Sequence, residues 1–85
     1  MLKFQEYMDK YVITEWILFP EYQDVKTFIE WLKSKNVKDL NNSSLSNYIN
    51  DYQGNLDMDF LNKYWSEFDQ ELIKNGIETN FTYNN

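Results

Sequence analysis

The chain has 85 residues, a formal charge of −6, 42% hydrophobic residues and 19% aromatic residues. This length gives one domain, and so many aromatic residues exclude a disordered chain. Cysteine, histidine, arginine and alanine are absent, which excludes disulfides, cysteine zinc sites, histidine- or thiol-based catalysis and guanidinium recognition of phosphate.

The N-terminal segment has the apolar spacing of an amphipathic helix. Apolar residues recur three, four, seven and eight positions after Phe4, so we expect a helix over residues 2–13. The stretch 14–19 contains several residues that strands favour, such as Ile17. We expect either a short helix or an extended piece there.

Pro20 opens the next helix, which we expect over residues 21–35. Proline suits a first helical turn, where its missing N–H would be unpaired anyway. Glu21 and Asp24 follow, and the positive end of the helix dipole favours both. The apolar stripe of this helix is Val25, Phe28, Ile29 and Leu32.

A third helix is predicted over residues 44–53, after a loop at 36–43. Ser43 or Ser44 is expected to cap it, and Gly54 to end it. Its apolar stripe is Leu45, Tyr48, Ile49 and Tyr52.

The last helix is predicted over residues 57–75. Asp57 is the expected N-cap, and Leu56 and Leu61 have the spacing of a hydrophobic staple. Gly76 is expected to end the helix in the left-handed conformation.

These elements predict one all-α domain over residues 1–77, a compact bundle of four to five short helices that is SAM-like or irregular. Polar residues 78–85 are expected to form a tail. The longest apolar run is 16–19, so we expect no transmembrane helix, no signal peptide and a cytoplasmic protein.

Catalytic and metal-binding interpretations find little support. The chain has only two glycines, so it contains no glycine-rich phosphate loop. Residues 50–59 are rich in oxygen ligands, but counted from Asp51 the sixth position of a calcium loop is Leu56 instead of glycine. We expect no enzymatic activity, no catalytic residue, no metal and no cofactor.

Negative charge is concentrated in the last third, where residues 55–85 carry six acids and two lysines. An acidic surface attracts basic partners and repels nucleic acid and anionic membranes. The acids of the last helix form either a solvated face or a surface that binds a basic protein. Glu67 and Glu71 are a like-charged pair four residues apart, which disfavours the helix slightly and favours a binding role.

Two tryptophans are candidates for contact with a partner. Trp31 lies at the margin of a predicted stripe, Trp16 lies outside the stripes, and the sequence leaves open whether each is buried. An exposed aromatic residue among acids is a typical anchor for a protein partner. The candidate partner-binding residues are Asp59, Glu67, Asp69, Glu71, Trp16 and Trp31.

Direct binding of nucleic acid is not expected. The only lysine cluster surrounds a locally neutral helix, and lysines near a helix C-terminus complement its dipole. The cluster consists of Lys26, Lys33, Lys35 and Lys38.

Two aromatic motifs mark the ends of the chain. They are Phe4, Tyr7, Met8 and Tyr11, and then Phe60, Leu61, Tyr64, Trp65 and Phe68. Both resemble the first and closing helices of the small YozE-like proteins of Gram-positive bacteria and their phages, although the middle of the chain does not align. Residues 27–52 are similar to part of the SAM-like arm-type domain of tyrosine recombinases, whose DNA-gripping basic residues are absent here. These resemblances imply a SAM-like fold and a bacterial or phage origin, but a fold implies no function.

The leading functional hypothesis is a small, acidic, non-enzymatic protein-binding module. Its sharpest form is a phage or mobile-element inhibitor that engages the basic, nucleic-acid-binding surface of a host protein. The alternative is a SAM-like accessory domain that self-associates or works beside DNA.

Overall fold

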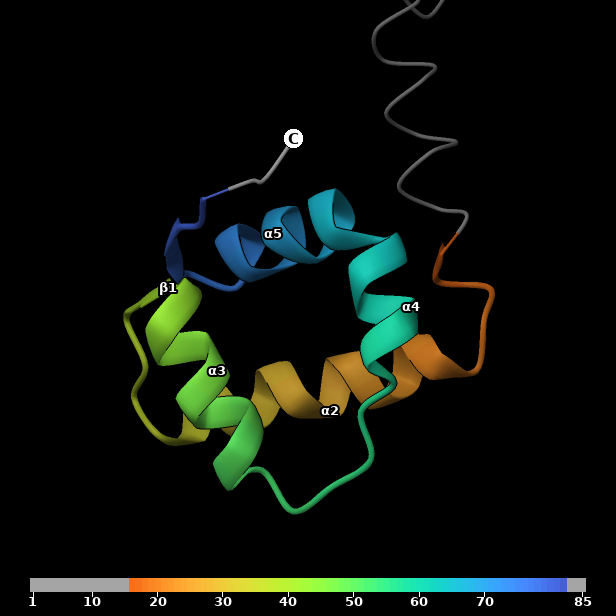
Figure 1. Ribbon diagram of the computed structural model, residues 1–85, viewed down its shortest axis with the longest axis horizontal. Helices are drawn as coiled ribbons and strands as arrows, with labels where there is room; N and C mark the ends of the chain where they lie inside the picture. The colour runs from red at the N-terminus through yellow and green to blue at the C-terminus, as the bar shows by residue number, and fades with distance from the viewer. Residues whose placement is uncertain (1–15, 83–85) are drawn as a thin grey trace, which may run out of the picture.

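A computed structural model describes residues 16–82, and Figure 1 shows how their elements are arranged. The elements are α2 (Glu21–Ser34), β1 (Asp39–Asn41), α3 (Asn42–Asp51), α4 (Met58–Lys63), α5 (Trp65–Lys74) and β2 (Glu78–Asn80). The described part of the chain is therefore mostly helical, as predicted. The all-α class is too narrow, because β1 and β2 form a small parallel sheet. The helix predicted over 2–13 lies outside the described residues.

Helix α2 forms where the sequence predicts it, and its whole apolar stripe is buried. It faces α5 across the core, where the ring centroids of Phe28 and Phe68 lie 6.5 Å apart. Fully burying a side chain of this size contributes about 1.5–3 kcal/mol. The pairing of these two helices accounts for much of the core of a small domain.

The helix α3 begins two residues earlier than predicted, and its cap is Asn41 instead of Ser43 or Ser44. The Ser44 backbone N–H donates to Asn41 Oδ1 at 2.8 Å, and the Asn41 N–H donates to Ser44 Oγ at 2.9 Å. Asparagine is as good a cap as serine. Ser44 acts as the second partner of the capping box.

The single helix predicted over 57–75 is two helices, α4 and α5, which change direction at Tyr64 (φ −109°, ψ 37°). Its predicted N-cap is confirmed, since the Phe60 N–H donates to Asp57 Oδ1 at 3.1 Å. The Tyr64 ring is buried, 4.9 Å from the Phe60 ring and 6.2 Å from the Trp16 ring. The bend lets α4 cover one end of the core while α5 covers its side.

Helices α2 and α5 end in the same way. Asn36 (φ 60°) and Gly76 (φ 81°) are left-handed. The following N–H donates back across the turn in each case: Val37 to the Leu32 carbonyl at 3.2 Å, and Ile77 to the Leu72 carbonyl at 3.0 Å. Both ends are Schellman motifs; the one at Gly76 was predicted and the one at Asn36 was not.

Each Schellman motif leads directly into a strand, and the two strands pair in parallel with Leu40 opposite Thr79. We expected a loop at 36–43 and a polar tail at 78–85, but 39–41 and 78–80 are strands. Strands of three residues are too short for an alternating pattern to predict them. Residues 17–19, in the stretch left open as helical or extended, form turns after Trp16.

Replacing Gly76 by alanine should lower the free energy of unfolding by about 1 kcal/mol, because the left-handed conformation penalises a Cβ atom. A Cβ there would meet no atom within 4 Å, so the effect comes from the backbone alone. Urea denaturation followed by tryptophan fluorescence measures it. Asn36→Gly is the matched control, and it should leave stability unchanged or slightly raised. Equal stability of Gly76→Ala and the wild type would contradict the prediction.

Candidate functional site

Two of the acids predicted to face a partner make side-chain hydrogen bonds to other elements. The Thr79 hydroxyl donates a hydrogen bond to Asp69 Oδ1, which ties β2 to α5. The Tyr22 hydroxyl donates to Glu71 Oε1 at 3.3 Å, which ties α2 to α5. Both carboxylates are half-buried. Asp69 and Glu71 are therefore poor choices for a free recognition surface.

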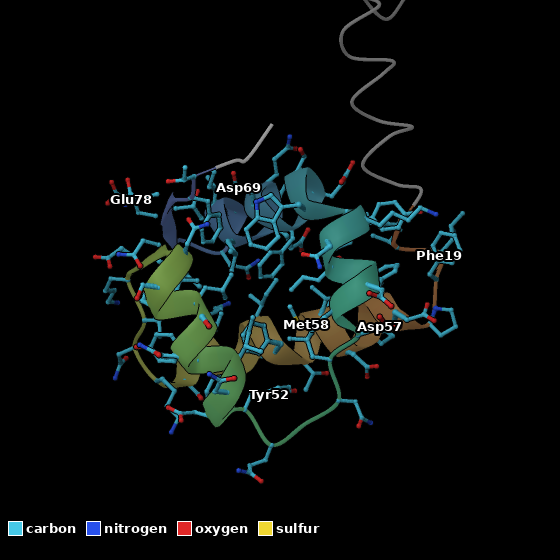
Figure 2. All side chains as sticks on the ribbon, in the orientation of Figure 1. Phe19, Tyr52, Asp57, Met58, Asp69 and Glu78 are labelled. Carbon is cyan, nitrogen blue, oxygen red and sulfur yellow. The ribbon has the colours of Figure 1, made fainter. Side chains whose placement is uncertain are left out.

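The remaining acids of the last third do not gather into one patch. Asp59 is exposed on α4, and Glu67 is half-buried on α5. Figure 2 shows Asp57 and Asp69 well apart on the molecule, with Glu78 beyond Asp69. The acids that follow one another in the sequence are spread out in space because α4 and α5 change direction at their junction.

Neither candidate tryptophan is an exposed anchor. Trp16 is fully buried (0% exposed), with its ring edge-on to Tyr22 at 4.8 Å and stacked on Phe60 at 6.1 Å. Its Nε1 has no hydrogen-bond partner within residues 16–82. Trp31 is half-buried and packs against Tyr52 at 5.1 Å. Trp16 therefore belongs to the core, and Trp31 is held against it.

The lysines around α2 are engaged in local contacts. Lys33 lies 3.7 Å from Glu30 and donates to Asn75 Oδ1 at 3.3 Å. Lys35 lies over the Trp31 ring, with Nζ 5.3 Å from the ring centroid. This arrangement agrees with the structural interpretation of these lysines, as side chains that stabilise a helix end.

Exposed apolar side chains gather beside the first turn of α4. Leu18 is 78% exposed, Phe19 41% and Ile17 39%. The Phe19 ring lies 6.0 Å from the rings of Phe60 and Tyr64. Figure 2 shows Phe19 and Asp57 on the same side of the molecule.

We call this surface the α4 corner, and it consists of residues 17–19 with Asp57 and Asp59. The sequence showed the apolar run at 16–19 but not its division into one core residue and three exposed ones. That division depends on the turn after Trp16, where the Phe19 N–H donates to the Trp16 carbonyl at 3.2 Å.

A second feature is an open groove of about 360 Å³ between α3 and the α4–α5 pair, which we call the α3–α4 groove. Its lining residues carry no charge: they are Asn42, Leu45, Ser46, Ile49, Asn50, Met58, Asn62 and Trp65. Apolar side chains come from both walls, and so do carboxamides. This volume lies in the range of small-ligand and side-chain sites.

The two residues that follow β2, Phe81 and Thr82, lie against two of the groove residues. The Thr82 N–H donates to Asn42 Oδ1 at 2.8 Å, and Asn42 Nδ2 donates to the Thr82 carbonyl at 3.2 Å. The Phe81 ring lies 4.9 Å from the Trp65 ring. The Asn42 carboxamide thus hydrogen-bonds to both main-chain groups of Thr82. The Trp65 ring contacts the side chain of the preceding residue, Phe81.

Other kinds of site find no support within residues 16–82. No group of three acidic side chains there could hold a metal ion. A second cavity, between α2 and α5, has about 50 Å³ and is lined by Lys26, Ile29, Glu30, Glu71 and Asn75. None of the described helices is both long enough and apolar enough to cross a bilayer.

Comparisons with known proteins supply no relative, since no protein-family model, curated protein or solved structure matches the chain. The resemblance to YozE-like and SAM-like domains stays a hypothesis. A function must therefore be argued from the α4 corner and the α3–α4 groove.

The contact between Tyr22 and Glu71 should appear in the pH dependence of stability. Burial raises the pKa of the Tyr22 phenol above 10.0, and the charge and hydrogen bond of Glu71 add to this rise. The contribution is therefore fully present below pH 10.0 and is lost as pH rises through the folded-state pKa. Urea denaturation at several alkaline pH values should show a steeper loss of stability for the wild type than for Tyr22→Phe.

Glu71→Gln is the control for this prediction. It removes the negative charge, so the pKa of Tyr22 should move back toward 10.0 in a spectrophotometric titration of tyrosinate. Identical pH profiles for wild type and Tyr22→Phe would show that the contact does not influence stability.

Proposed function

We propose that the protein is a non-enzymatic protein-binding module that engages a basic surface through the α4 corner. The exposure of Leu18 carries the proposal, because 78% of a large aliphatic side chain faces solvent between two further exposed apolar residues. Single exposed apolar residues are ordinary, but contiguous ones mark interaction sites.

The α4 corner is supported from beneath by buried aromatic rings. Phe19 rests on Phe60 and Tyr64, and these two rings in turn contact the buried Trp16. A loop fixed in this way loses little conformational entropy when it binds. Preorganisation of this kind favours affinity.

Charge beside the apolar residues indicates the kind of partner. Asp57 caps α4 and Asp59 lies in its first turn, and the nearest lysine in the sequence, Lys63, lies over the Tyr64 ring. Lysine or arginine on a partner would meet complementary potential there. The proposal keeps Asp59 from the residues expected at the sequence level and replaces Asp69, Glu71 and Trp16 with residues 17–19.

A nucleic-acid-binding protein is the partner class that best fits an acidic surface with an apolar centre. Carboxylates can occupy a groove that otherwise binds phosphates, since both are anionic acceptors of hydrogen bonds. An inhibitor of mobile-element or phage origin is the specific form of this proposal. It requires that the protein and nucleic acid compete for the same partner.

The double variant Leu18→Ser/Asp59→Lys should lose its partner when the immobilised protein is used to capture binding proteins from lysate of its native host. It removes the most exposed apolar contact and reverses one charge, so we expect a loss of captured partner of about tenfold or more. Quantitative mass spectrometry measures the loss.

Glu78→Lys is the matched control for charge reversal. Glu78 is exposed and lies on the side of the molecule opposite Phe19 (Figure 2), so this variant should retain the partner. Thermal unfolding of all variants verifies their folding. Equal capture by the wild type and the double variant would contradict the proposal, and so would equal loss in both variants.

A further inference from the structure

The walls of the α3–α4 groove present to solvent the same two kinds of group, carboxamides and apolar side chains, that already hold residues 81–82. Asn42 pairs with both main-chain groups of Thr82, and Trp65 receives the Phe81 ring. Both residues line the groove. Residues 81–82 therefore provide, within the protein, an example of how this wall pairs with the main chain of a peptide segment.

Further along the groove lies a second set of such groups. Ile49 and Asn50 come from α3, and Met58 and Asn62 from α4. Met58 and Asn62 are four residues apart, which places them on one face of α4. The carboxamides of Asn50 and Asn62 have no hydrogen-bond partner among the described residues. Each wall thus offers an apolar side chain next to a free carboxamide.

The size of the groove favours an extended segment over a helix. About 360 Å³ holds one or two large side chains, whereas a docked helix needs several anchors along one face. A helix also uses its own main-chain N–H and carbonyl groups, so they cannot pair with a carboxamide. An extended peptide leaves both groups free.

The charges beside the groove indicate which residues should flank the apolar side chain of that peptide. Asp51 follows Asn50 at the end of α3, and Asp57 and Asp59 flank Met58. All three acids are exposed. A peptide whose apolar side chain enters the groove would place its neighbouring residues near these carboxylates, where lysine or arginine is favoured.

We propose that the α3–α4 groove binds an extended peptide segment of a partner protein, with one large apolar side chain followed by lysine or arginine. The apolar side chain packs between Ile49, Met58 and Trp65. The carboxamides of Asn50 and Asn62 pair with the peptide main chain, as Asn42 pairs with Thr82. This inference rests on the proposed function in that it takes the partner to be a basic protein, but it concerns a neighbouring surface that shares Asp57 and Asp59 with the α4 corner.

The test uses the full chain, labelled with ¹⁵N, and the synthetic peptide acetyl-Gly-Phe-Thr-Lys-Lys-amide. Its Phe-Thr pair copies residues 81–82, and its lysines test the charge argument. Titration followed by NMR should shift the side-chain amides of Asn50 and Asn62 and the indole of Trp65 in a saturable way. Replacing the peptide's phenylalanine by alanine, or its lysines by glutamate, should abolish these shifts.

The variant Asn50→Ala/Asn62→Ala should raise the Kd by about tenfold, because two hydrogen bonds to the peptide are lost. Alanine is a good helix residue, so the fold should persist. Asn47→Ala is the matched control, since Asn47 is exposed on α3 and does not line the groove. It should leave the Kd unchanged.

Several outcomes would overturn the inference: no saturable shift, an unchanged Kd for the double variant, or shifts of residues 81–82 that show displacement of this segment from Asn42 and Trp65. Shifts of the same groups on raising protein concentration without peptide would assign the groove to a second copy of the chain. The single variant Leu18→Ser separates the two proposals, because Leu18 belongs to the α4 corner and does not line the groove. If only the groove inference fails, Leu18→Ser still loses the captured partner while the peptide shows no binding to the groove of the wild type.

Discussion

The parallel pairing of β1 with β2 sets the positions of the other elements. It joins segments far apart in the sequence, and the bond from the Glu78 N–H to the Lys38 carbonyl (2.9 Å) continues it. The pairing holds the C-terminal ends of α2 and α5 together, so the two helices must face each other across the core. It also fixes the start of α3, which follows β1 directly.

Local chemistry made part of this fold predictable. The buried stripe of α2, the cap at Asp57 and the left-handed Gly76 each depend on residues within one or two turns, so the sequence alone indicates them. The strands and the bend at Tyr64 depend instead on residues that are remote in the sequence. A three-residue strand is stabilised by a partner remote in sequence, and Tyr64 departs from helical geometry in a buried cluster with Trp16 and Phe60.

The candidate sites were less predictable, because a side chain's type does not reveal what lies opposite it. The sequence indicates a surface acid at Glu71, but in the structure its carboxylate accepts a hydrogen bond from the Tyr22 hydroxyl. Trp16 and Leu18 belong to one apolar run, yet one is in the core and the other is in solvent. The α3–α4 groove has no sequence signature at all, since its walls come from separate helices that present ordinary asparagines and aliphatic residues.

The three tryptophans lie in three distinct environments. Trp16 lies beneath the α4 corner, Trp65 lines the α3–α4 groove, and Trp31 packs beside Tyr52 with Lys35 over its ring. Each environment imposes its own polarity on an indole, so each ring is an intrinsic fluorescent reporter of its region. Variants that keep one tryptophan at a time, with phenylalanine at the other two positions, would therefore give a separate optical signal for each region without an added dye.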